Sequence, residues 1–206
     1  MIRFAALCLL AAGVLQDEVT VPVPPGEFVT ILHANGEKAR EGRVVDGRRS
    51  GPWTAWYADG TKRYAGSYEN YARVGEWTYW RTDGTKEKSG TYDAEGRRHG
   101  EWTLLDEGEQ LVRISRWKHG DPHGKWERYD AGKPMMSHTW VEGAQNGVSA
   151  FYFPDGKTMS SGDIRYGKRE GTWREFYFNG GKRYEGEYVG GKEEGAWTHW
   201  HENGQK

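Results

Sequence analysis

A motif that begins with glycine recurs along this chain at intervals of about 24 residues. The spacing from one such glycine to the next is nearly constant, and the glycines are Gly51, Gly75, Gly100, Gly124, Gly147, Gly171 and Gly195. Self-similarity at a fixed period is typical of repeat architectures, in which each unit buries its surface against its neighbours. The sequence therefore predicts a repeat array rather than one or two ordinary globular domains.

Aromatic residues occupy fixed positions after each glycine, which we number as position 1. Position 3 is tryptophan in every unit except the fifth, which has Ser149, and these residues are Trp53, Trp77, Trp102, Trp126, Trp173 and Trp197. Position 6 is aromatic or leucine, and these residues are Trp56, Trp80, Leu105, Tyr129, Tyr152, Phe176 and Trp200. Rings at these positions supply the large apolar area that each unit needs to bury.

An Asp-Gly or Asn-Gly pair follows the aromatic residues, with its glycine at Gly36, Gly60, Gly84, Gly156, Gly180 or Gly204. Such a pair between aromatic-rich runs favours a primed hairpin turn, because both central residues tolerate positive φ. The units at Gly100 and Gly124 have turns that we expect to be one residue shorter, ending at Gly108 and Gly132. Each unit is thus predicted to be one β-hairpin.

We predict an all-β fold, an elongated and solenoid-like single sheet made of antiparallel hairpin repeats of about 24 residues. A sheet of this size should curl rather than stay flat. Positions 3 and 6 are three residues apart and lie on opposite faces of a regular strand. Either both faces carry aromatic residues or the strand is bulged, and the sequence leaves both alternatives open.

The ends of the chain differ from the repeats. Residues 1–15 have an early cation, an apolar core and small residues, which predicts a secretory signal peptide and an exported protein that is periplasmic or extracellular. Residues 16–27 are predicted to be a Pro-rich linker. Residues 28–206 are predicted to hold a partial capping unit and seven repeats, the last of them incomplete. Cys8, within the signal peptide, is the only cysteine.

No constellation of catalytic residues is recognisable, so we predict that the protein is not an enzyme and uses no cofactor. Two histidine pairs have spacings that a metal site could use, His119 with His123 and His199 with His201. The first lies in a loop and the second lacks a third ligand, so we predict no metal site. The formal net charge of −1 argues against nucleic acid and against a membrane lipid as partners.

The two aromatic rows have different expected roles. The position-3 tryptophans are predicted to form the core. The position-6 residues are the candidates for an exposed stacking ladder, and the ladder consists of Trp56, Trp80, Tyr129, Tyr152, Phe176 and Trp200.

The pattern Gly-x-Trp-x-x-aromatic followed by Asp/Asn-Gly resembles the bacterial MORN-repeat variant, and in particular proteins labelled YwqK-type antitoxins. The units at Gly51, Gly75, Gly171 and Gly195 carry the resemblance best. It implies antiparallel hairpins in an extended array and a role in protein interaction, and it supplies no catalytic residues. A weaker similarity is to choline- and cell-wall-binding repeats, which have a shorter period.

The functional prediction is therefore a non-catalytic, exported repeat protein that mediates protein–protein interaction, with an antitoxin-like role as one form of it. An unidentified protein is the expected partner. The alternative is a module that binds cell-wall glycan or another carbohydrate through the aromatic ladder.

Overall fold

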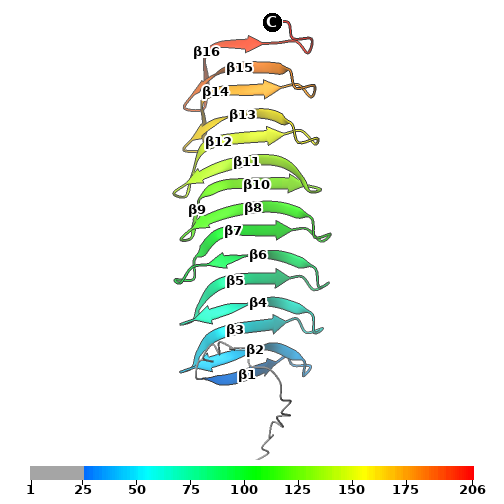
Figure 1. Ribbon diagram of the computed structural model, residues 1–206, viewed down its shortest axis with the longest axis vertical. Coiled ribbons are helices and arrows are strands. Elements are labelled where there is room, and N and C mark those ends of the chain that lie inside the picture. The colour runs from blue at the N-terminus through cyan, green and yellow to red at the C-terminus, as the bar shows by residue number, and fades with distance from the viewer. Residues whose placement is uncertain (1–25) are drawn as a thin grey trace, which may run out of the picture.

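The computed structural model describes residues 26–206, which form a single antiparallel sheet of 16 strands. The strands are β1 (Glu27–Leu32), β2 (Lys38–Val45), β3 (Arg48–Trp56), β4 (Lys62–Glu69), β5 (Ala72–Trp80), β6 (Lys86–Tyr92), β7 (Arg98–Leu105), β8 (Leu111–Lys118), β9 (Asp121–Pro122), β10 (Gly124–Asp130), β11 (Lys133–Val141), β12 (Ala144–Tyr152), β13 (Thr158–Arg165), β14 (Lys168–Phe176), β15 (Lys182–Val189) and β16 (Lys192–His199). Each strand pairs with the next one in the chain, except that the short β9 pairs with β8 beside β10. The strands stack along the long axis of the molecule (Figure 1).

This architecture confirms the predicted all-β array of hairpins. The strand order begins at β1 and ends at β16, so the sheet is open. The predicted signal peptide and nearly all of the predicted linker lie outside the described residues, and β1 begins at Glu27, one residue before the predicted repeat domain. Within residues 26–206 no helix is long and apolar enough to cross a membrane.

The core is a stack of tryptophan rings on glycines. The ring of Trp77 lies so close to Gly66, in the strand before it, that a Cβ on this glycine would be 2.2 Å from the ring. The indole Nε1 of Trp77 donates a hydrogen bond of 3.2 Å to the carbonyl of Ser67. The same close approach pairs Gly42 with Trp53, Gly90 with Trp102, Gly162 with Trp173 and Gly186 with Trp197. A side chain at any of these glycines would displace the ring, so each glycine is required by packing.

Burial of the tryptophans confirms the predicted core in four units: Trp53, Trp77, Trp102 and Trp173 are at most 4% exposed. Trp126 and Trp197 are only half-buried. The register of β10 on β8 places Trp126 opposite Ser115, where other units have glycine, and Trp197 lies in the last strand of the sheet.

The Asp-Gly and Asn-Gly turns are not of the predicted primed type. In the turn from Tyr57 to Thr61, only Gly60 has positive φ, at 86°. The Asp59 carboxylate accepts a hydrogen bond of 2.8 Å from the backbone of Thr61, and this local bond is compatible with a type I turn that ends in a left-handed glycine. Primed turns occur instead mostly where one unit connects to the next, for example at Asp46–Gly47, where both residues have positive φ.

The predicted shortening of the turn in the third unit is wrong. Asp106 and Gln110 close a turn with the same hydrogen bonds as the other units, and Glu109 takes the left-handed position at φ 58°. Gly108 has no positive φ. The fourth unit does have a short turn, whose two central residues are Ala131 and Gly132.

β-bulges account for the three-residue spacing of positions 3 and 6, for which the sequence left two explanations open. The pairing register of β3 and β4 shifts between Ala55 and Trp56, immediately before position 6. The same shift precedes position 6 in the five following hairpins. The strands are therefore bulged at the place where the spacing of the aromatic residues breaks the alternation of a regular strand.

Candidate functional site

The predicted ladder residues lie in separate repeats and are all half-buried. Within residues 26–206, no ring–ring contact joins two of them. Lysine ammonium groups already lie over three of the rings: Lys38 is 5.7 Å from the Trp56 ring centroid, Lys62 is 5.8 Å from Trp80, and Lys182 is 5.4 Å from Trp200. These cation–π contacts occupy ring faces that a stacking ligand would need.

Arginine covers the other aromatic row, and the sequence analysis missed it. The signal was an arginine two residues before the glycine of position 1, at Arg49, Arg73, Arg98 and Arg169. Each guanidinium lies 4.2 to 5.1 Å from the centroid of the position-3 tryptophan of its unit. The aromatic face of the sheet is thus lined by cations.

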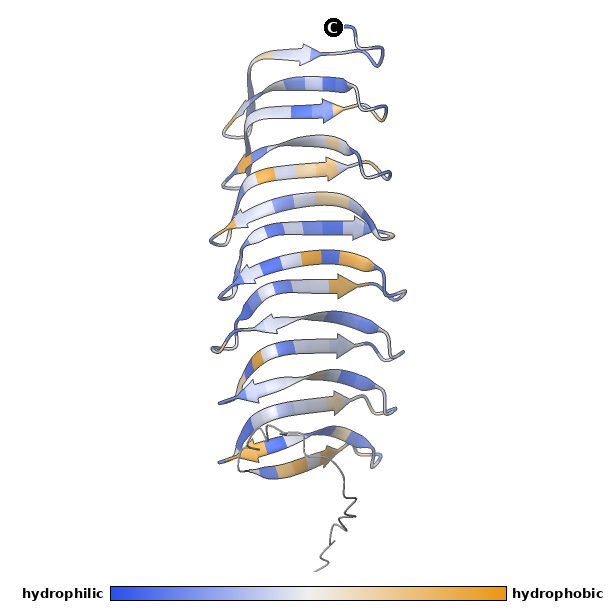
Figure 2. Cartoon of the chain, in the orientation of Figure 1, coloured by the Kyte–Doolittle hydropathy of each residue, from blue (hydrophilic) through white to orange (hydrophobic). Residues whose placement is uncertain are grey.

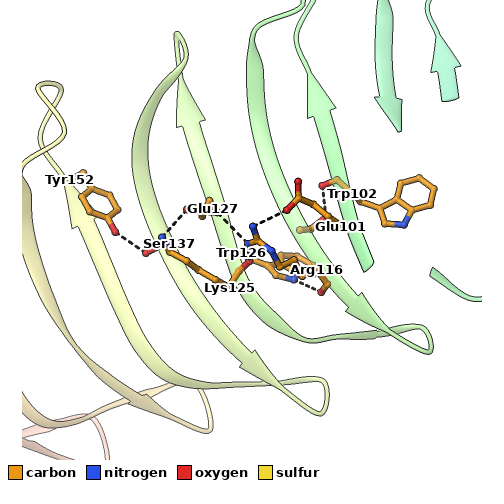
Figure 3. Close-up of polar contacts among 9 residues, drawn as sticks. Glu101, Trp102, Arg116, Lys125, Trp126, Glu127, Ser137 and Tyr152 are labelled. Atoms are coloured by element: carbon orange, nitrogen blue, oxygen red, sulfur yellow. Dashed lines mark hydrogen bonds and ion pairs between the residues drawn. The ribbon is translucent and has the colours of Figure 1, made fainter. Parts of the chain in front are cut away.

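An ionic network links neighbouring strands in the middle of the array (Figure 3). Arg116 pairs with Glu101 at 2.8 Å and with Glu127 at 3.2 Å, and Lys125 pairs with Glu127 at 2.7 Å. Burial opposes ionisation of Glu127, but hydrogen bonds from Lys125 and Arg116 hold the pKa of its carboxyl below its usual range. Such partly exposed pairs contribute little stability singly, so this network mainly sets the orientation of its side chains.

One repeat reverses the usual packing of tryptophan on glycine. His138 stands opposite Ser149 in β11 and β12, at the place where other units have glycine and tryptophan. The His138 Nδ1 and the Ser149 Oγ are 2.8 Å apart. The large ring has therefore moved to the preceding strand, and burial lowers the pKa of His138.

A cavity opens next to this irregular repeat, where Ser160 stands at a position that larger side chains occupy in the other units. Ser160 pairs with Glu175, whereas two of the equivalent pairs in other units are Tyr64 with Tyr79 and Tyr184 with His199. The space that a tyrosine ring would fill forms part of a cavity of about 460 Å³. Its aromatic walls are Trp173, Tyr184, Tyr188 and Trp197.

This cavity continues into an apolar hollow nearer the middle of the chain. A smaller hollow joins the cavity to this apolar hollow. It shares Ser160, Arg169 and Glu175 with the cavity, and Phe151 and Met159 with the apolar hollow. The apolar hollow, of about 410 Å³, adds Met135, Met136, Pro134 and Pro154. We name this continuous depression across β11 to β16 the β11–β16 groove.

The groove contains one cationic group that is available to a ligand. The Arg169 guanidinium lies 4.2 Å from the Trp173 ring and donates a 3.0 Å hydrogen bond to the Tyr188 hydroxyl, and none of the ion pairs within residues 26–206 includes it. The indole Nε1 of Trp197 also lacks a hydrogen-bond partner in the described chain, but it is buried and therefore not accessible to a ligand. Glu175, by contrast, pairs with Arg183 at 2.6 Å. The groove therefore offers an apolar end and an end with a guanidinium that has no acidic partner among the described residues.

Comparisons with known proteins identify one hairpin of this region. Residues 169–189 match the family model described as MORN repeat variant. This hairpin contributes Arg169, Trp173, Tyr184 and Tyr188 to the groove. The match confirms the predicted repeat type over that hairpin, and it gives the predicted YwqK-type antitoxin role no support.

No curated protein matches the sequence. Among solved structures, a mutant of S. aureus TarM in complex with fondaparinux, alpha-GlcNAc-glycerol and UDP matches at 12% identity and a TM-score of 0.34, over 46% of this chain and 19% of that chain. A second structure of TarM matches at 18% identity and a TM-score of 0.23, over 58% of this chain and 19% of that chain. The matched part therefore spans about a fifth of the TarM chain.

Proposed function

We propose that this protein is a non-catalytic repeat protein that binds an extended segment of a partner protein in the β11–β16 groove. The observation that carries the proposal is the Ser160–Glu175 pair, which opens the aromatic face at one place in the array. In every other hairpin the residue equivalent to Ser160 has a larger side chain, namely Arg40, Tyr64, Lys88, Arg113, Met136 or Tyr184. A continuous depression with an apolar end and a few convergent polar groups is the usual form of a binding site.

The apolar end of the groove suits a large aliphatic or aromatic side chain. Met135 and Met159 are 44% and 37% exposed, and both line this end. Methionine side chains are flexible and polarisable, and they are common on surfaces that adapt to a protein ligand. Contact with such a side chain would remove these methionines from water.

The other end of the groove suits a carboxylate. Arg169 has a guanidinium with no acidic partner among the described residues, held by the Trp173 ring and the Tyr188 hydroxyl. An arginine held in this way is preorganised to bind a carboxylate through two hydrogen bonds. We therefore propose a ligand segment that carries a large apolar residue followed by an acidic residue.

The test is site-specific cross-linking of the full chain. A photoreactive amino acid at Met159 would be exposed to envelope extract of the native host, because the protein is predicted to be exported. The same capture would be repeated with Arg169→Gln and with Arg73→Gln, a control at the equivalent repeat position with the same type of contacts to tryptophan and tyrosine.

We expect the native chain to capture one protein in stoichiometric amount. The yield of cross-linked protein should be unchanged in Arg73→Gln and about tenfold or more lower in Arg169→Gln. Equal capture by both variants would overturn the proposal, as would a cross-link to residues 1–25 of the same chain. The identity of the captured protein would also test the antitoxin-like role.

Carbohydrate binding is the second candidate, favoured by the four aromatic walls around the polar groups of the larger cavity. Sugars stack on tryptophan and tyrosine and accept hydrogen bonds from arginine. The test is retention of the protein on purified cell wall. Retention that soluble glycan releases, and that is lost in Trp197→Ala but not in Trp53→Ala, would favour this candidate over a protein ligand.

A further inference from the structure

We infer that Asp93, His99 and His119 form a binding site for a divalent transition-metal ion. One ligand atom from each of these residues lies within 4.8 Å of the other two. The residues come from the connection after β6, from β7 and from the connection after β8. Their spacing in the chain matches no local metal motif, and only the sheet brings them together.

An irregularity of the array creates this cluster. Most connections between units are two-residue turns, but β6 and β7 are joined by a longer turn in which Asp93 accepts hydrogen bonds from the backbone of Glu95 and Arg97. The neighbouring turn places His119 at φ 50°, and its Gly120 donates a 2.9 Å hydrogen bond to the carbonyl of Arg98. The two turns are therefore fastened side by side.

The donor set suits a metal such as Zn²⁺ or Co²⁺. Two imidazoles and one carboxylate are common ligands of these ions and leave further positions for water. The His119 Nδ1 is 3.0 Å from an Asp93 carboxylate oxygen, and the rings of His99 and His119 are 5.1 Å apart. The His99 Nδ1 is buried and has no hydrogen-bond partner within the described residues. A bound ion would give this set of donors a common partner.

Arg97 is the group that a metal must displace. Its Nε is 3.0 Å from the Asp93 carboxylate and its Nη2 is 3.2 Å from the His119 Nδ1. The same guanidinium also pairs with Glu95 at 2.9 Å, and the side chain is 47% exposed. Arg97 can therefore keep its ion pair with Glu95 while Asp93 binds the metal.

The test is titration of the full, metal-free chain with Co²⁺ and Zn²⁺, followed by calorimetry and by the visible spectrum of bound Co²⁺. The variants are Asp93→Asn, which keeps the oxygen that caps the turn, and His119→Asn, since asparagine tolerates positive φ. His201→Asn is the control, because His201 is an exposed histidine outside the cluster.

We expect one ion per chain, with affinity reduced about tenfold or more in Asp93→Asn and His119→Asn and unchanged in His201→Asn. Arg97→Gln should raise the affinity about threefold or more, because it removes a neighbouring positive charge. Circular dichroism would check that each variant is folded. His119 lies in an exposed turn, so its substitution should leave the fold intact. No saturable binding by the native chain, or equal binding by His119→Asn, would overturn the inference.

Discussion

At the scale of residues, the exchange between His138 and Ser149 shows how this core tolerates change. In the regular units a glycine leaves room for the tryptophan of the next strand, and a Cβ on that glycine would lie 2.2 to 2.5 Å from the ring. In the exceptional unit the ring belongs to His138 and the small residue is Ser149, which is 1% exposed. The pair conserves the combination of one large and one small side chain, which close packing requires.

This complementarity predicts a coupling between the two positions. Ser149→Trp alone should destabilise the protein by about 1–3 kcal/mol, because the new ring meets His138 where other units have glycine. His138→Gly alone should cost about 2 kcal/mol through the void that it leaves. The double variant should recover most of both losses. Denaturant unfolding would measure the three free energies, and strictly additive losses would contradict the packing argument.

At the scale of elements, the two-residue turns need positive φ at both central residues. The second of these residues is glycine at Gly47, Gly120, Gly132, Gly143, Gly167 and Gly191, but it is tyrosine in the turn Asn70–Tyr71. Tyr71 has φ 70° and is 61% exposed. A side chain held in the left-handed region with so little burial stores backbone strain.

Relief of this strain should make Tyr71→Gly more stable by about 1 kcal/mol. Some of the gain is offset by loss of the contact between the Tyr71 ring and the Arg48 guanidinium, which are 5.1 Å apart. The reciprocal control is Gly167→Ala, where an added Cβ would meet nothing within 4 Å and only φ opposes it. That variant should lose about 1 kcal/mol. Thermal unfolding would measure both, and a destabilised Tyr71→Gly would refute the prediction.

At the scale of the whole molecule, the sheet has no second layer within the described residues, so each hairpin is stabilised mainly by its two neighbours. Figure 2 shows that most strands are pale or hydrophilic, with only short hydrophobic segments. The cluster of buried residues Trp53, Tyr68 and Trp77 lies in β3 to β5, whereas the groove interrupts the packing toward β16. Stability should therefore vary along the array.

Hydrogen exchange should reveal this gradient. We expect backbone amides of β3 to β5 to exchange about tenfold or more slowly than those of β14 to β16, because fewer buried contacts oppose local opening near the groove. Mass spectrometry of peptides from the exchanged chain would measure the difference. Uniform protection from β3 to β16 would show instead that the array unfolds as one cooperative unit.

The sequence alone is enough to predict the repeat period, the hairpins and most of the core tryptophans, because each depends on contacts that recur at a fixed spacing. Glycine at position 1 and tryptophan at position 3 satisfy the same local geometry in unit after unit, so a pattern in the chain is also a pattern in space. The turn types were less predictable, because an Asp-Gly pair is compatible with both a primed turn and a type I turn. In the structure the Asp59 side chain accepts a hydrogen bond that favours the type I turn.

The positions where the repeat pattern breaks and candidate sites form are apparent only from the folded structure. Ser160 is an ordinary polar residue in the sequence, and it opens a groove only because the sheet places it where Tyr64 and Tyr184 stand in other units. Asp93 and His119 follow different strands of the array, yet their side chains lie 3.0 Å from each other. Such groupings depend on the register between neighbouring hairpins, which is set by bulges and turn lengths that a single sequence does not reveal.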